Sequence, residues 1–152
     1  AGADPDPRTF AQPAFSCATA TDDRALAKRA LALMSEVDPY AAVYWSSKLV
    51  AQGRGREALA VLGKADVAGT GDDGLLRADH HVRVGAGVLV RDWDTVIRLL
   101  DERDDLDPQL RAYAASTLYD AGYRRTGRRL LAAVCAELAA EQRAICEDLV
   151  KR

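Results

Sequence analysis

Hydrophobic residues recur every three or four positions along most of this 152-residue chain, which is the period of helices that bury one face. A first stripe follows Thr21, which can cap a helix, and contains Leu26, Ala30, Met34 and Val37. Asp38-Pro39 predicts the start of a second helix, because Asp is a good N-cap and Pro is tolerated at the first helical position. That helix ends near Gly53, and a short helix follows as far as Ala65.

The sequence DVAGTGDDG, residues 66–74, predicts a solvated loop because it is rich in glycine and aspartate. The segment that follows has two interpretations. Its valines alternate from Val82 to Val90 as in a strand, yet Leu75, Val82 and Trp93 also fit a helical stripe. We predict a helix, because a single strand among helices would leave its backbone groups unpaired.

The rest of the chain repeats these signals. Asp92 or Asp94 opens another helix, Asp107-Pro108 repeats the Asp-Pro start, and Gly122 supplies a turn. A last helical stretch of some 27 residues is either one long helix or is broken near residues 139–141. The fold class predicted from these patterns is all-α.

Charge and composition limit the possible functions. The formal net charge is −2, which argues against a general nucleic-acid binder, because such proteins meet phosphates with many Lys and Arg. No apolar run approaches the roughly 20 residues that span a bilayer. Residues 66–110 carry a net charge of −6 and residues 111–152 a net charge of +3, so neighbouring helices could complement one another or a partner could be steered.

The first 20 residues are rich in Pro, Asp and small side chains, and we expect a flexible lead-in there. Residues 21–152 then form a single domain, since the length suits one core. Such a lead-in is typical of a chain from which a signal peptide has been removed, although a trimmed chain would look the same. The compartment stays open between export to the periplasm and the cytoplasm.

Three cysteines, Cys17, Cys135 and Cys146, have no metal-binding spacing. On one straight helix the last two would be about 16 Å apart along the axis, too far to bond to each other. Cys17 could reach either of them, and buried free thiols are the alternative.

The helical hairpins form a degenerate repeat. Units anchored on Ala58, Val96 and Gly127 recur after 38 and then 31 residues. The first unit places small, large, turn and packing residues in the order Ser46, Leu49, Gly53, Ala58, Leu59, Leu62 and Ala65. The second offers Trp93, Val96, Ile97 and Leu100, and the third Ala115, Leu118, Gly122, Gly127 and Leu131.

Over roughly residues 39–137 this pattern resembles the tetratricopeptide repeat family, whose unit is two antiparallel helices in about 34 residues. The resemblance implies a right-handed α-α superhelix of about three stacked hairpins, with residues 21–37 as the second helix of a leading unit. Independently of the family, small residues at crossing points let helices pack closely, and each hairpin must bury its apolar stripe on the next.

Residues that could carry chemistry are sparse. His80 and His81 are adjacent, so on a helix they point about 100° apart and cannot easily grip one metal ion. The serines and cysteines lack a nucleophile motif, and the glycines at 69, 71 and 74 lack the ending of a phosphate loop. We expect no metal, no cofactor and no catalytic residues, and a small enzyme centred on either histidine is the minor alternative.

A cluster of four arginines is the sharpest charge signal: Arg124, Arg125, Arg128 and Arg129. They crowd the first turns of the last helical stretch, where the helix dipole disfavours cations. Either the acidic segment 101–107 compensates them, or an acidic peptide, lipid headgroup or phosphate from a partner does.

The stacked fold would present a concave groove, and its expected wall is Tyr40, Val43, Ser47, His81, Gln109, Ser116 and Tyr119. Aromatic and small polar groups suit a peptide or partner helix, although the tyrosines could instead complete the core. We therefore expect a non-enzymatic protein-interaction module, an adaptor or scaffold with a protein or peptide partner. The alternative is a helical accessory domain or subunit of a bacterial-type envelope or secreted enzyme or assembly machinery, with catalysis elsewhere.

Overall fold

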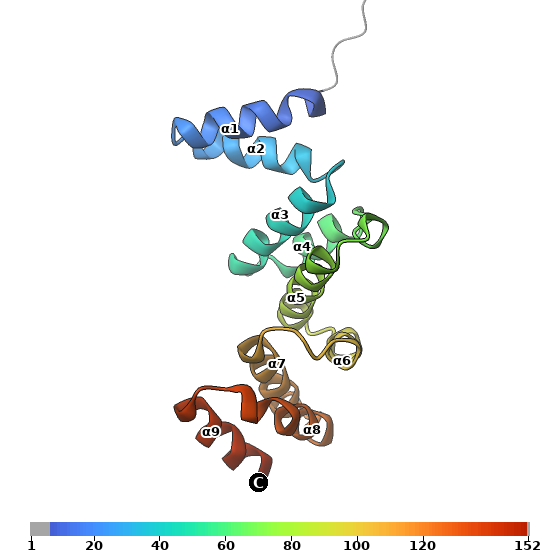
Figure 1. The fold of residues 1–152 in the computed structure, drawn as a ribbon, viewed down its shortest axis with the longest axis vertical. Helices are drawn as coiled ribbons and strands as arrows, with labels where there is room; N and C mark the ends of the chain where they lie inside the picture. Colours follow the sequence, from blue (N-terminus) through green and yellow to red (C-terminus); the bar gives the residue numbers. More distant parts are fainter. Residues whose placement is uncertain (1–6, 152) are drawn as a thin grey trace, which may run out of the picture. The chain divides into compact units, whose positions relative to one another are not determined.

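The chain is all-α. A computed structural model describes residues 7–151, with Arg8 described by its backbone alone, and in that range it contains helices and no strand (Figure 1). The α-helices are α1 Ala11–Ala20, α2 Arg24–Met34, α3 Pro39–Ala51, α4 Gly55–Leu62, α5 Asp73–Val90, α6 Trp93–Glu102, α7 Pro108–Asp120, α8 Arg124–Val134 and α9 Ala140–Lys151. None of these helices combines the length and the apolar character that crossing a bilayer would need.

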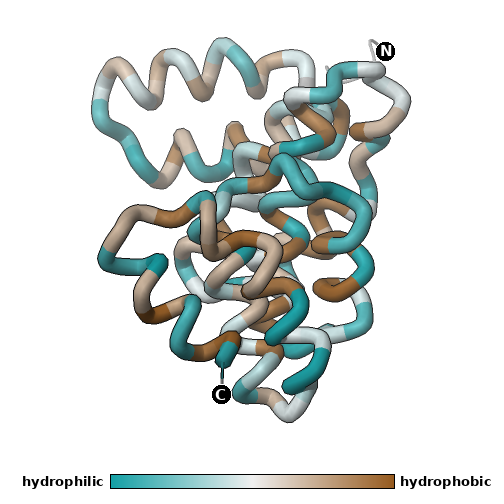
Figure 2. The backbone as a smooth tube through the Cα atoms, turned by 60° about the horizontal axis from the view of Figure 1, so that its bottom comes forward, coloured by the Kyte–Doolittle hydropathy of each residue, from teal (hydrophilic) through white to brown (hydrophobic). Residues whose placement is uncertain are grey.

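The chain divides into two compact units, Ala1–Asp79 and His80–Arg152. In the first, α1 pairs with α2 and α3 with α4. In the second, α7 pairs with α8, and α9 packs on α8. Hydrophobic and hydrophilic stretches follow one another along the helical chain (Figure 2). The second unit has a core of buried apolar residues: Val84, Val88, Val96, Leu99, Leu100, Leu106, Ala114 and Leu118.

Four helix-to-helix turns share one hydrogen-bonding pattern. In each, a residue with positive φ ends the first helix, and the next backbone N–H donates to a carbonyl five residues back, a bond that closes helix C-termini. The positive-φ residues are Asp22, Gly53, Arg91 and Gly122. The bonds run from the N–H of residues 23, 54, 92 and 123 at 2.8–3.0 Å. The turns are therefore 31, 38 and 31 residues apart.

The hairpins α3–α4 and α7–α8 match position by position at an offset of 69 residues. Asp38 and Asp107 cap their first helices, each followed by a proline, as the sequence predicted. Gly53 and Gly122 make the turns. Buried pairs at the same offset are Leu49 with Leu118, Ala58 with Gly127, and Leu62 with Leu131.

Small residues lie where paired helices cross. A Cβ atom built on Gly127 of α8 would lie 2.7 Å from the carbonyl oxygen of Ala115 and 2.8 Å from the backbone nitrogen of Tyr119, so no side chain fits there. At the matching place in α3–α4, the Ser46 hydroxyl donates to the carbonyl of Ala58 at 3.2 Å. Alanine and glycine thus allow the backbones to approach closely.

Two local predictions are confirmed and two need correction. Residues 73–90 are a helix, and Asp92 caps α6. The lead-in expected over residues 1–20 is wrong for Ala11–Ala20, which form α1; Pro13 is tolerated because it lies in the first turn. Residues 1–6 lie outside the described range. Thr21 does not cap α2, because its hydroxyl donates to Cys17 while Asp23 accepts the capping bond.

Candidate functional site

A cleft opens on the second unit between α7 and α9, with α8 beneath it. We call it the α7–α9 cleft, and its lining is Gln109, Ala112, Ser116, Leu131, Leu138, Gln142, Ile145, Cys146 and Leu149. Its volume is about 220 Å³. Each wall is a straight helical stripe at positions i, i+3 and i+7, since these positions share one helix face.

The cleft exists because the last helical stretch is broken. α8 ends at Val134, a single 3-10 turn follows, and the extended backbone of Leu138, with ψ of 157°, reverses the chain into α9. The almost buried Arg111 of α7 donates to both carboxylate oxygens of Glu137 in this turn, at 3.0 and 3.1 Å. The pair fixes the turn against α7, and α9 therefore returns alongside α8 and completes the cleft.

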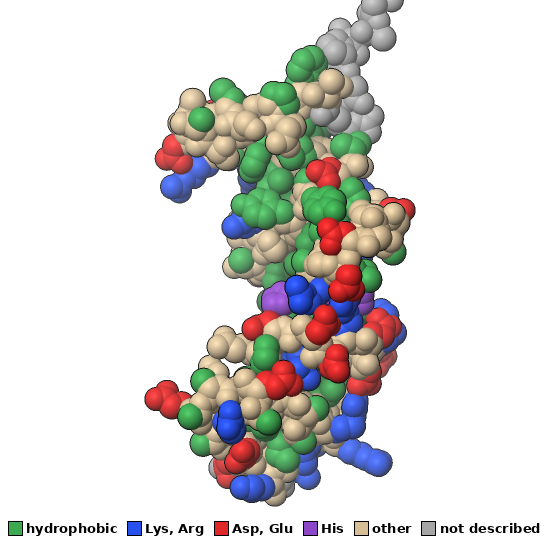
Figure 3. All heavy atoms as spheres, in the orientation of Figure 1, with side chains coloured by type: hydrophobic (Ala, Val, Ile, Leu, Met, Phe, Trp, Pro, Cys, Tyr) green, Lys and Arg blue, Asp and Glu red, His purple; other side chains and the backbone are tan. Residues whose placement is uncertain are grey.

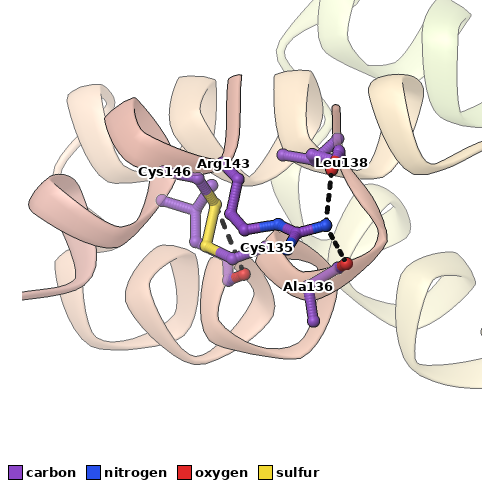
Figure 4. The surroundings of a disulfide bond; sticks show 6 residues. Cys135, Ala136, Leu138, Arg143 and Cys146 are labelled. Carbon is purple, nitrogen blue, oxygen red and sulfur yellow. Dashed lines mark hydrogen bonds between the residues drawn. A yellow bond between two sulfur atoms is a disulfide. The ribbon is translucent and has the colours of Figure 1, made fainter. Parts of the chain in front are cut away.

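A disulfide closes the same turn. Cys135 and Cys146 are bonded, with their Cα atoms 5.6 Å apart (Figure 4). The sequence excluded this bond only for one straight helix, and the break after Val134 removes that condition. Cys17, which the sequence left as a possible partner of either cysteine or as a buried free thiol, is a free thiol and is exposed. The Arg143 guanidinium donates to the carbonyls of Ala136 and Leu138, at 2.9 and 3.1 Å, and so also stabilises the turn (Figure 4).

The lining chemistry is an apolar floor with a few polar groups at the walls. Leu131, Leu138 and the disulfide sulfur of Cys146 are buried below, whereas Ile145 on the rim is 66% exposed. Exposed side-chain amides of Gln109 and Gln142 can donate and accept hydrogen bonds. This arrangement can hold apolar side chains and orient the backbone that carries them.

No protein-family model, curated protein or solved structure matches this chain. The resemblance to the tetratricopeptide repeat therefore depends on the turns and packing positions described above.

The expected groove residues fall on both units, so the groove as a whole stays a prediction. Gln109 and Ser116 line the α7–α9 cleft. In the first unit Tyr40 is 52% exposed, Ser47 is half-buried, and Val43 is 5% exposed and packs in the core. In the second, His81 is exposed and Tyr119 is half-buried. The wall contributed by α9 was missed, although Gln142, Ile145 and Leu149 have the spacing of a helix face.

The four arginines lie together around a second hollow, on the side of α8 that faces the end of α9. Arg124, Arg125, Arg128 and Arg129 line it with Ala132 and Val150. Figure 3 shows Lys and Arg side chains projecting from the second unit over α8. Arg129 donates to both oxygens of Asp101, at 2.9 and 3.1 Å, so the acidic segment compensates this one arginine. The guanidinium of Arg128 lies over the Tyr119 ring, 5.9 Å from its centroid.

The two histidines have different surroundings. Nε2 of His80, which is half-buried, lies 3.5 Å from a carboxylate oxygen of Glu102 on α6. The hydrogen bond from Arg98 and, less strongly, this contact with His80 hold the pKa of Glu102 below its usual value. Among residues 7–151, no group of three or more His, Cys, Asp or Glu side chains is arranged to hold a metal ion.

In the first unit a hydrogen bond from a tyrosine, which we call the Tyr40–Asp72 tie, connects α3 to the loop after α4. The Tyr40 hydroxyl donates to Asp72 at 2.8 Å. This bond raises the pKa of Tyr40. The pKa of Asp72 is lowered, first by the backbone N–H of Leu75 and second by Tyr40. The tie therefore stabilises the fold at neutral pH, and it is lost as pH falls through the lowered pKa of Asp72 or rises through the raised pKa of Tyr40.

We expect Tyr40→Phe to raise the pKa of Asp72, while the Leu75 N–H still keeps it below the ordinary aspartate value. Carboxyl ¹³C NMR titration of Asp72 measures this change. Tyr44→Phe is the matched control, because Tyr44 is a similarly exposed tyrosine one turn along α3. An unchanged Asp72 titration in Tyr40→Phe would show that the bond does not persist in solution.

Proposed function

We propose that this chain is a non-enzymatic, tetratricopeptide-like interaction module that binds a short amphipathic segment of a partner protein in the α7–α9 cleft. The observation that carries the proposal is the cleft itself, with its apolar floor and amide-bearing walls. Four hairpin turns of one pattern, spaced 31, 38 and 31 residues apart, support a stack of repeated hairpins with a superhelical twist.

The size of the cleft favours a peptide over an enclosed small molecule. Pockets for small molecules measure roughly 300–1,000 Å³ and bury most of the ligand. The α7–α9 cleft holds about 220 Å³ and has Ile145 exposed on its rim. One or two apolar side chains of a peptide can enter it while the rest of the peptide stays in water.

The two walls of the cleft also determine the length and the side chains that a bound peptide needs. Positions i to i+7 cover about 10 Å of helix, so the cleft accommodates about two turns of a partner helix. The partner needs apolar residues at helical spacing to meet Leu131, Leu138 and Leu149, and polar groups on either side to meet Gln109 and Gln142. A partner of this kind suits an adaptor, and it also suits an accessory subunit whose partner performs catalysis.

Selection of binding peptides from a random displayed library tests the proposal. The selected peptides are expected to carry apolar residues at i, i+3 or i+4, and to bind the intact chain saturably. Ile145→Lys places a charge on the apolar rim and is expected to weaken the binding of these peptides at least tenfold. The bound peptide would either have to desolvate the Lys or be displaced by it. Isothermal titration calorimetry measures the affinities.

The matched control is Ala144→Lys, which adds the same charge at the adjacent exposed position of α9, outside the cleft lining. It is expected to leave the affinities nearly unchanged. Equal loss in both variants would mean that net charge, and not the cleft, governs binding. Peptides that bind both variants like the wild type would refute the cleft as the site.

A further inference from the structure

The arginine cluster on α8 is only partly neutralised by the protein itself. Arg129 is paired with Asp101. For Arg124 and Arg125, no ion pair or hydrogen bond of the side chain is formed with the described residues 7–151. Arg128 lies over Tyr119, and its Nε atom is buried without a hydrogen-bond partner in that range. Three positive charges thus line the hollow without a carboxylate.

The nearby acidic segment 101–107 supplies little of what is missing, because four of its five carboxylates are engaged elsewhere. Asp101 holds Arg129, Glu102 holds Arg98 and contacts His80, Asp105 holds Arg103, and Asp107 caps α7. Asp104 is exposed. The acidic segment 101–107, one of the two compensating groups considered from the sequence, therefore pairs with one of the four arginines.

The start of α8 adds further positive potential. Tyr123 occupies the N-cap position and makes no side-chain cap, and the first turn of α8 contains no acidic residue. The first N–H groups of a helix have no partner within the helix, and they place about half a positive charge at that end. Arginines there are unfavourable unless an anion is bound, so a ligand would relieve a cost present in the free protein.

The number of charges indicates the kind of anion. A carboxylate brings one negative charge and two acceptor oxygens. A phosphate monoester brings a charge of about −1.5 to −2 and three strong acceptor oxygens. Guanidinium groups bind phosphate oxygens in pairs of hydrogen bonds, so three arginines can satisfy one phosphate fully. Ala132 and Val150 at the edge of the hollow can contact the group that carries the phosphate.

We propose that Arg124, Arg125 and Arg128 form a binding site for a soluble phosphate monoester dianion. The site is separate from the α7–α9 cleft and does not depend on its function. It requires no change in the fold, since the three side chains already line one hollow of about 530 Å³.

Phenyl phosphate is the probe, titrated into the intact ¹⁵N-labelled chain at constant ionic strength while the arginine Nε–Hε signals are followed by NMR. Saturable shifts are expected at Arg124, Arg125 and Arg128. Benzenesulfonate, with the same ring but a single charge, should bind more weakly. Equal binding of the two anions would overturn the assignment to a dianion, and so would the absence of saturable shifts.

Single substitutions separate the roles of the arginines. Arg124→Gln, Arg125→Gln and Arg128→Gln should each weaken phenyl phosphate about tenfold, the effect of removing one hydrogen bond to a charged group. The matched control is Arg56→Gln, because Arg56 lies 69 residues before Arg125 at the same place in the α3–α4 hairpin. It should have no effect, and a loss as large as that of Arg125→Gln would contradict the site.

A variant that binds phenyl phosphate more tightly gives the most decisive test, because a misfolded chain would not gain affinity. Asp101→Asn releases Arg129, which then adds a fourth cation to the hollow, and phenyl phosphate should bind about two to five times more tightly. Unchanged or weaker binding in a folded Asp101→Asn chain would contradict the proposal. Binding to vesicles that contain phosphatidic acid, with none to phenyl phosphate, would show a membrane site and overturn it as well.

Discussion

Reduction of the Cys135–Cys146 disulfide is expected to destabilise the second unit by about 3 kcal/mol and to release α9. The bond closes a short loop, with a sequence separation of 11 residues. Cross-linking such a loop lowers the conformational entropy of the unfolded chain, which stabilises the folded state by about 3 kcal/mol. The apolar contacts of α9 alone are few, because most of its residues are exposed. Since α9 forms one wall of the α7–α9 cleft, the cleft should be lost with it.

Hydrogen exchange of the α9 amides measures this effect with and without reductant. A loss of 3 kcal/mol corresponds to protection about a hundredfold lower. Cys17→Ser in the background prevents thiol exchange and should itself change nothing, because Cys17 is exposed and unbonded. The double variant Cys135→Ala, Cys146→Ala should behave like the reduced protein and should not respond to reductant. Full protection of α9 after reduction would show that Arg143 and the apolar packing suffice.

Gly127→Ala is expected to lower the free energy of unfolding by about 1 kcal/mol, against the usual preference of helices for alanine. Alanine gains up to about 1 kcal/mol in helix propensity. Its Cβ, however, would lie under 3.0 Å from two backbone atoms of α7, which cannot rotate away. Overpacking of this kind costs about 1–3 kcal/mol, and here α7 and α8 must separate to relieve it.

Gly87→Ala is the matched control in a neighbouring hairpin. Its added Cβ would lie 2.7 Å from one side-chain methyl, that of the buried Val96, and its backbone neighbour, the carbonyl oxygen of Asp92, is at an ordinary 3.7 Å. Urea denaturation of both variants should therefore show the larger loss for Gly127→Ala. A stabilised Gly127→Ala would mean that the α7–α8 crossing is looser than the structure has it.

Local signals allowed the all-α class and several helix starts and turns to be predicted from the sequence. Asp-Pro starts at residues 38 and 107 and the glycine turns at 53 and 122 have a local physical cause, so they could be identified without tertiary information. Helix α1 was missed because its composition suggested a lead-in, although a proline within the first turn is compatible with a helix.

The cleft was harder to predict because it depends on long-range contacts. Gln109 and Ser116, expected in a groove, line one wall of the cleft, but the opposite wall required the reversal at Leu138. That reversal is held by Arg111 with Glu137 and by a disulfide, and neither pairing has a signature in the sequence. The arginine cluster was visible because its four members lie within six residues of one helix.

The central claim is that a partner peptide occupies the α7–α9 cleft, and methyl cross-saturation NMR tests it most directly. With a selected, deuterium-free peptide bound to the deuterated chain, saturation should pass to the methyl groups of Leu131, Leu138, Ile145 and Leu149. It should not reach Leu59 or Val61 of α4 in the first unit. Saturation confined to α4, or spread evenly over exposed methyl groups, would contradict the proposed cleft.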